Sequence, residues 1–147
     1  MNILFLLKPK KSVSYLYDDD TIRQGLEKMR GHSYTASPVL SHEGYYVGTI
    51  NEGDFLRGIF RNNEGDLKHL DEEQVQDILR KDWNHPVKVS ATVEDLLERV
   101  LNQNFVPVVD DRGLFVGIIT RQSVIKHFRD QILELKKKVE KKERHSV

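Results

Sequence analysis

Hydrophobic and polar positions follow the same order of patterns in both halves of the chain. In the first half, an extended run over residues 13–17 precedes apolar positions with helical spacing, such as Leu26 and Met29. A strand with a proline near its start, over residues 34–40, is followed by a tight turn and a returning strand over residues 45–50. Helices and strands differ in the spacing of their apolar positions. The pattern therefore predicts the order β-α-β-β-α, with a second helix directly after the returning strand.

The second half repeats this order. An extended run over residues 87–89 comes first, followed by helical spacing over residues 97–101. A proline strand over residues 105–109 and a returning strand over residues 114–120 complete it. We therefore expect two copies of one α/β (α+β) unit.

The repeat is also visible in the residues themselves. Residues 38–50 (PVLSHEGYYVGTI) match residues 107–119 (PVVDDRGLFVGII), with Pro, Val, Gly, Val and Gly recurring at an offset of 69. Upstream, Thr21 and Thr92 both stand where a helix N-cap is expected. One copy cannot bury both its sheet and its helices, so we expect the two to pack about a pseudo-twofold axis.

This repeat sets the predicted division of the chain. Short helices over residues 3–7 and 75–79 are expected to lead into the first and the second copy. The predicted parts are repeat 1 (residues 1–60), a polar linker (61–74), repeat 2 (75–129) and a C-terminal helical extension (130–147).

The C-terminal extension continues a stripe of apolar residues with heptad spacing. Its members are Ile125, Phe128, Ile132, Leu135 and Val139. Such a stripe either folds back on the body of the protein or forms a dimer contact. Residues 126–147 also carry eight Lys and Arg against four Asp and Glu, which is typical of a solvated helix face and less often of a contact surface.

Composition excludes several functional classes. The chain has no cysteine, which removes thiolate catalysis and cysteine zinc sites. Lys and Arg balance Asp and Glu at 23 each, so no overall basic field attracts nucleic acid. No metal-binding histidine spacing or nucleophile elbow is present, and we expect neither an enzyme nor a metal site. The opening apolar run MNILFLL is too short for a membrane span, and a soluble, cytoplasmic protein is expected.

The tandem segments YTASPVL…EGYYVGTINEGDF and NFVPVVDDRGLFVGIITRQSV resemble the CBS domain family. That resemblance implies two β-α-β-β-α repeats forming a disc with two nucleotide-binding clefts, and discs that commonly form homodimers. Each cleft pairs the proline strand of one copy with the strand–helix junction of the other. At such a junction, free backbone N–H groups and the positive end of the helix dipole favour phosphate.

The resemblance assigns cleft A to residues of both copies. Thr120 keeps the hydroxyl expected to bind phosphate, and Arg121 adds a cation. Ser123 stands where the family has the carboxylate that binds ribose. The predicted members are Val13, Ser14, Tyr34, Thr35, Ala36, Pro38, Ile118, Thr120, Arg121 and Ser123.

Cleft B departs from the family pattern in the opposite way, since it keeps the carboxylate and lacks the hydroxyl. Asp54 keeps the ribose carboxylate, but Asn51 replaces the hydroxyl and Glu52 would repel a phosphate. This cleft could hold a nucleoside or a weakly charged ligand. Its predicted members are Thr49, Asn51, Glu52, Asp54, Val87, Val89, Asn104, Phe105 and Pro107.

The resemblance extends to small stand-alone CBS pairs of Firmicute-type bacteria, some of which sense cyclic di-AMP. A cyclic dinucleotide lacks a free 2′,3′-diol, so the absent ribose carboxylate in cleft A matters little to it. Cyclic di-AMP and AMP, ADP or ATP stay open as regulatory ligands, with an effector protein regulated in trans. The alternative is a structural protein with degenerate clefts that dimerises without a ligand.

Overall fold

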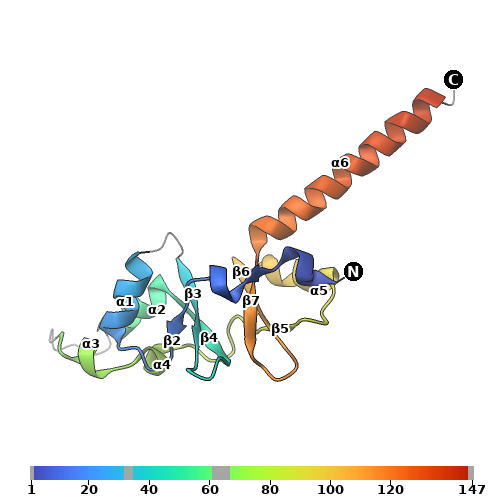
Figure 1. Ribbon diagram of the computed structural model, residues 1–147. Coiled ribbons are helices and arrows are strands. Elements are labelled where there is room, and N and C mark those ends of the chain that lie inside the picture. The colour runs from blue at the N-terminus through green and yellow to red at the C-terminus, as the bar shows by residue number, and fades with distance from the viewer. Residues whose placement is uncertain (1, 32–34, 61–66, 146–147) are drawn as a thin grey trace.

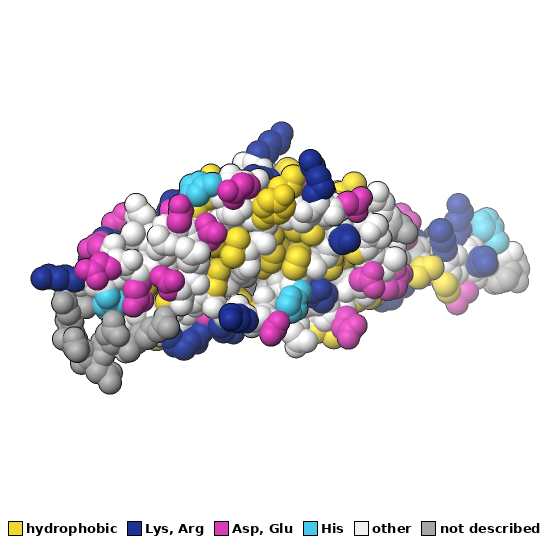
Figure 2. All heavy atoms as spheres, turned by 90° about the horizontal axis from the view of Figure 1, so that it is seen from below, with side chains coloured by type: hydrophobic (Ala, Val, Ile, Leu, Met, Phe, Trp, Pro, Cys, Tyr) yellow, Lys and Arg dark blue, Asp and Glu magenta, His cyan; other side chains and the backbone are white. Residues whose placement is uncertain are grey.

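The two repeats lie side by side and a long helix projects from the second one (Figure 1). The computed structural model describes residues 2–31, 35–60 and 67–145. Within this part of the chain, no helix is both long and apolar enough to cross a membrane. Acidic and basic side chains are interspersed over the face seen in Figure 2, in keeping with the zero net charge.

The first repeat has the predicted order of elements. Thr21 caps its first helix, accepting a 3.1 Å hydrogen bond from the backbone N–H of Gln24, as expected for this residue type. The extended run predicted over residues 13–17 is a strand only at its end. The elements are β2 (Leu16–Tyr17), α1 (Ile22–Arg30), β3 (Ala36–Leu40), β4 (Tyr46–Asn51) and α2 (Glu52–Phe60).

The second repeat matches the first element by element. Thr92 caps its first helix, accepting a 3.3 Å hydrogen bond from the N–H of Asp95. Its last strand leads without a break into the final helix. The elements are β5 (Val87–Lys88), α5 (Val93–Val100), β6 (Phe105–Val109), β7 (Phe115–Thr120) and α6 (Arg121–His145).

Short elements that precede each repeat in sequence pack on the other repeat. The N-terminal segment contains the 3-10 helices η1 (Ile3–Leu6) and η2 (Lys10–Ser12) and, between them, strand β1 (Lys8–Pro9), which pairs antiparallel with β7. Ile3 is fully buried in the core of the second repeat. The helix α4 (Val75–Ile78) lies in the reciprocal place, with Val75 in the core of the first repeat. The sheets therefore have the orders β1-β7-β6-β5 and β2-β3-β4.

The hairpin turns of the two repeats meet at their shared interface. Gly44 and Gly113 have positive φ angles of 96° and 86°, which glycine adopts without strain. The backbone N–H of Phe115 donates to the carbonyl of Gly44 at 2.9 Å, and Tyr45 bridges to Leu114. These contacts are nearly symmetric and join the repeats about the expected pseudo-twofold axis.

The segment predicted only as a polar linker contains a short helix, α3 (His69–Glu72). The ring of His69 contacts the carbonyl of Gly58 at 3.3 Å, and Leu70 is buried in the first repeat. Leu70 is the apolar residue that anchors this turn within a charged sequence. A single apolar residue has no periodicity, so the sequence pattern could not predict the helix.

The final helix α6 runs unbroken over 25 residues and projects away from the body (Figure 1). The predicted boundary at residue 130 therefore falls within one helix. Val124 is buried against the second repeat, whereas Ile132, Leu135 and Val139 are exposed. The sequence left two interpretations of the apolar stripe, folding back on the body or a dimer contact. In the structure, the stripe does not fold back on the body.

Candidate functional site

Cleft A is a cavity of about 490 Å³ between the two repeats. Strand β3 of the first repeat forms one wall, and the junction of β7 with α6 forms the other. Its volume lies in the range of small-molecule sites. The lining residues are Lys8, Val13, Ser14, Thr35, Ala36, Pro38, Asn104, Phe105, Ile118, Thr120, Arg121, Gln122 and Ile125.

Eight of the ten residues predicted for cleft A line this cavity. Tyr34 lies outside the described residues, and Ser123 does not line it. The side chain of Ser123 instead turns to its own helix, where its hydroxyl donates to the Thr120 carbonyl at 2.9 Å. Among the described residues that line the cleft, none therefore offers a carboxylate to a ribose diol.

Thr120 is the last residue of β7 and Arg121 is the first residue of α6. The Thr120 hydroxyl oxygen accepts from the backbone N–H of Ser123 at 3.1 Å, so it caps the helix. Arg121 donates through Nε to the carbonyl of Val100 at 2.7 Å, which uses one of the five N–H donors of its guanidinium. The helix N-terminus and this side chain both bring positive charge to the cavity wall.

A second cation comes from the N-terminal strand. Lys8 lines cleft A because β1 pairs with β7, where Lys8 stands opposite Ile118. Within the part of the chain that the structure describes, Lys8 and Arg121 are the only charged residues that line the cavity. Cleft A is therefore suited to an anion.

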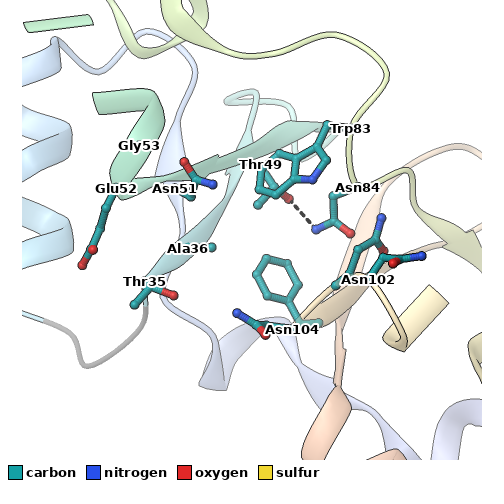
Figure 3. Close-up of a pocket in the computed structure, with 12 residues that line it drawn as sticks. Thr35, Ala36, Thr49, Asn51, Glu52, Gly53, Trp83, Asn84, Asn102 and Asn104 are labelled. Carbon is teal, nitrogen blue, oxygen red and sulfur yellow. Dashed lines mark hydrogen bonds between the residues drawn. The ribbon is translucent and has the colours of Figure 1, made fainter. Parts of the chain in front are cut away.

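Cleft B is smaller, about 290 Å³, and most of the residues that line it are polar (Figure 3). Of the described residues that line it, Glu52 alone is charged, so the charge at its wall is opposite to that of cleft A. The residues around it are Thr35, Ala36, Thr49, Asn51, Glu52, Gly53, Trp83, Asn84, Asn102, Gln103, Asn104 and Phe105.

Five of the nine residues predicted for cleft B line it: Thr49, Asn51, Glu52, Asn104 and Phe105. Val87 is buried in the core of the second repeat instead, and Val89 packs against that core. Pro107 and Asp54 are also absent from the lining. Trp83 and Asn84 line the cavity instead (Figure 3). They belong to the connector between α4 and β5, residues 79–86.

Asp54 is fully engaged inside the protein. Its buried carboxylate accepts from the backbone N–H of Asn51 at 2.9 Å and from Arg80 Nε at 2.7 Å, and it also pairs with Arg57. The side-chain oxygen of Asn51 accepts in return from the N–H of Asp54. The carboxylate predicted to bind ribose thus fixes the start of α2 and holds the connector through Arg80.

A ring of hydrogen bonds supports cleft B from behind. Tyr46 donates to the carbonyl of Asn84 at 2.7 Å, and its oxygen lies 2.7 Å from the Thr49 hydroxyl. Because the single phenolic proton goes to Asn84, the Thr49 hydroxyl must donate to Tyr46. Asn84 Nδ2 then donates to Thr49 at 3.0 Å. Burial raises the pKa of Tyr46 to about 12, against the opposing effect of the Thr49 hydrogen bond.

Two buried oxygens in cleft B have no hydrogen-bond partner within the described part of the chain. They are Asn84 Oδ1 and Gln103 Oε1. Both oxygens are inaccessible from the cleft as it stands, and a buried acceptor without a donor is costly. Trp83 adds an indole to the same cavity, with Arg80 over its ring at 3.8 Å from the centroid.

The family model for the CBS domain matches residues 7–61 and 75–130. The chain belongs to the CBS domain family. Both matched segments coincide with the two repeats, and the proline strands β3 and β6 stand between the two clefts of this CBS pair.

Among similar proteins, the cyclic di-AMP receptor B of Bacillus subtilis is 26% identical over 133 residues, covering 90% of this chain and 89% of that protein. The fold is also that of Listeria monocytogenes CbpB in complex with c-di-AMP, with a TM-score of 0.79 and 22% identity over 88% of this chain and 96% of that one. CBSX2 in complex with AMP has a TM-score of 0.69 and 21% identity over 92% of this chain and 98% of that one. All three are similar along most of the length of the CBS pair.

Several lining residues were missed by the sequence interpretation. Lys8 reaches cleft A only through the exchange of β1 between repeats, which no local pattern indicates. Trp83 is the only tryptophan of the chain and precedes Asn84, whose φ of 53° is unusual for a residue with a side chain. A lone tryptophan in a polar connector was the available signal. Within the described residues, no group of His, Cys, Asp or Glu could hold a metal ion.

Proposed function

We propose that the protein is a non-catalytic regulatory module that binds an adenine nucleotide in cleft A and signals to a partner protein in trans. The observation that carries this proposal is the junction of β3 from one repeat with the first turn of α6 from the other. Strand β3 offers backbone groups and apolar side chains to a base. The start of α6 offers helix N–H groups and Arg121 to a phosphate.

The chemistry of cleft A favours a cyclic dinucleotide over a mononucleotide. Lys8 and Arg121 supply two cations, one on each of two elements, and a cyclic dinucleotide carries two phosphodiesters. Ser123 is bonded to its own helix and no described residue that lines the cleft is acidic, which removes the usual partner of a free ribose diol. Cyclic di-AMP is therefore our preferred ligand, ahead of AMP, ADP or ATP. The similarity of this chain to the cyclic di-AMP receptor B of Bacillus subtilis supports the same choice of ligand.

Isothermal titration calorimetry with cyclic di-AMP, AMP, ADP and ATP tests this proposal. Cyclic di-GMP is the matched control, because it has the same two phosphodiester charges but guanine in place of adenine. We expect cyclic di-AMP to bind most tightly and cyclic di-GMP much more weakly. Equal binding of the two cyclic dinucleotides would contradict recognition of adenine, and no binding of any of them at millimolar concentration would refute the proposal.

Cleft B supports a different ligand class. Glu52 opposes a phosphate, while lining residues such as Asn102 and Asn104 carry amides that can bond to a neutral base. We propose that it binds an uncharged nucleoside. Since Trp83 is the only tryptophan and lines this cleft, its fluorescence reports cleft B alone. Adenosine should change that fluorescence and AMP should not, and the reverse order would refute this assignment.

The alternative is a structural protein whose clefts bind nothing. The engagement of Asp54 with Arg57 and Arg80 is the observation that favours it, because it removes the ribose acceptor from cleft B. Under this alternative, all titrations give no heat and self-association is independent of added nucleotides.

A further inference from the structure

Beyond the body of the protein, α6 carries an apolar stripe that the chain itself does not cover. Ile132, Leu135 and Val139 are 53%, 61% and 55% exposed. Together with the exposed Ile125 and with Phe128, which is partly buried against the second repeat, they repeat at alternating intervals of three and four residues. A single helix projecting into water is only marginally stable, and heptad spacing is the pattern by which two helices cover one another.

Toward the body, the same stripe borders a groove between α5 and α6. The groove has a volume of about 720 Å³ and an apolar lining. The lining includes Leu97 of α5, Leu101 directly after α5, and Ile125 and Ile132 of α6. Leu101 is 77% exposed. An apolar face is therefore continuous from α5 along most of the length of α6.

We propose that this face pairs in parallel with the same face of a second copy of the chain. The α6 helices would form a two-stranded coiled coil, and the α5–α6 groove would receive the base of the partner's α6. Homodimerisation through α6 does not depend on either cleft binding a ligand.

Charge at the edges of the stripe selects this partner and this orientation. With Ile125, Ile132 and Val139 as the first position of each heptad, Lys138 and Glu143 occupy the two flanking positions that meet across a parallel pair. Lys138 then lies beside the partner's Glu143, and the contact occurs twice by symmetry. An antiparallel pairing of the same stripe would instead place Arg129 beside the partner's Lys136, two like charges.

The outer face of α6 argues against an anionic membrane as the partner. Lys137, Lys141 and Arg144 lie there, but Glu134 and Glu140 are interspersed among them. A helix that binds an anionic surface carries mainly basic residues on its polar face. A mixed face is typical of the solvated outside of a coiled coil.

The proposed contact between the two α6 helices, here called the dimer seam, begins at residues that also form a wall of cleft A. Arg121 and Ile125 line both the cleft and the groove. A ligand in cleft A would fix these two side chains from one side and the partner copy from the other, so each event lowers the ordering entropy that the other must overcome. This coupling, which rests on the proposed function, makes the dimer tighter when cleft A is occupied.

Sedimentation velocity of the full chain over a range of concentrations tests the seam. We expect a dimer for the native sequence and a monomer for Leu135→Glu, a change at an exposed position that leaves the fold intact. Lys137→Glu introduces the same residue on the outer face and should stay dimeric. A native chain that remains monomeric, or a Leu135→Glu chain that remains dimeric, would overturn the seam. So would a monomer that co-sediments with phosphatidylglycerol vesicles, which would indicate a membrane surface instead.

Disulfide trapping tests the orientation, because the chain contains no cysteine of its own. Lys142 occupies an inner heptad position near the end of α6 and Arg144 an outer one. Oxidised Lys142→Cys should form a linked dimer and Arg144→Cys should not. A Lys142→Cys chain that does not link while sedimenting as a dimer would overturn the parallel arrangement.

The coupling is measured as the dimer dissociation constant with and without saturating cyclic di-AMP, whose binding is established separately by calorimetry. We expect the dimer to tighten about five-fold or more, a common size for coupled sites. An unchanged constant with bound nucleotide would overturn the coupling. Absence of binding heat would refute the proposed function, and the sedimentation of the native and Leu135→Glu chains would still decide the seam.

Discussion

The guanidinium of Arg121 donates a 2.7 Å hydrogen bond to the carbonyl oxygen of Val100, the last residue of α5. Carbonyls at the end of a helix have no partner within it, so this bond completes α5 while holding the first residue of α6 against it. The same side chain lines cleft A and the α5–α6 groove. One residue therefore joins the proposed ligand site to the proposed dimer seam.

Replacing Arg121 with alanine should weaken binding of cyclic di-AMP by about ten-fold or more, because a charge-assisted hydrogen bond contributes about 1.5–3 kcal/mol. Titration calorimetry measures the change. Lys126→Ala removes an exposed positive charge from the same helix outside both cavities and should leave the affinity within about two-fold of the native value. Native affinity in Arg121→Ala would refute the assignment of cleft A.

Replacing Asp54 with alanine should lower the free energy of unfolding by about 2 kcal/mol. The change removes the bond that the Asp54 carboxylate accepts from the Asn51 N–H at the start of α2, and the charge-assisted bonds to Arg57 and Arg80. Both arginines reach solvent, so neither becomes a stranded buried charge, which limits the loss. Urea denaturation measures it.

Asp71→Ala is the matched control, since the Asp71–Arg23 pair is exposed and should contribute little. If Asp54→Ala instead kept native stability, the carboxylate would not be the structural anchor that its contacts indicate.

Local elements were predictable because their signals are local. Thr21 and Thr92 cap their helices as expected, and β6 spans residues 105–109 as predicted. What could not be predicted depends on partners far along the chain. Asp54 meets Arg80, 26 positions away, and Lys8 reaches cleft A only because β1 crosses to the second repeat. A repeat in the sequence reveals which elements exist, but it does not reveal which of them are exchanged.

The candidate site divides in the same way. Residues on the strands and at the start of α6 were predicted because they follow the motif that both copies share. Ser123 and Asp54 were predicted from that motif too, yet each is bonded to groups within its own repeat or the connector. A motif position indicates where a residue stands and not which neighbour its side chain will bind.

Stability should fall at alkaline pH through Tyr46. Burial raises its pKa from the usual 10.0 to about 12, so between these values the unfolded chain loses a proton that the folded chain keeps. The free energy of unfolding is therefore lost as pH rises through this window, by up to about 2 kcal/mol. Urea denaturation at a series of pH values measures this slope.

The Tyr46→Phe chain should lose this part of the pH dependence. At neutral pH it should be less stable by about 1–2 kcal/mol, because the buried carbonyl of Asn84 loses its donor. Tyr45→Phe, at a half-exposed position, should keep the native slope. An identical alkaline slope in the native and Tyr46→Phe chains would contradict the role of this hydroxyl.

The equivalent glycines of the two repeats should respond differently to alanine. A Cβ on Gly117 would overlap the carbonyl oxygen of Lys8, where β1 crosses to pair with β7, and its φ of 156° is also unfavourable for a side chain. A Cβ on Gly48 would lie 3.5 Å from Leu79, an ordinary contact. We expect Gly117→Ala to lower the free energy of unfolding by about 2 kcal/mol or more and Gly48→Ala to change it by much less.

Hydrogen exchange distinguishes the physical cause, because Gly117→Ala should specifically release the N-terminal segment from the second repeat. Exchange of amides in residues 3–9 should become faster, while amides of α1 in the first repeat stay protected. Since Lys8 comes to cleft A on this segment, the same variant should also bind cyclic di-AMP more weakly than Gly48→Ala does. Equal effects of the two substitutions on stability would mean that the exchange of β1 between repeats does not hold this edge of the fold.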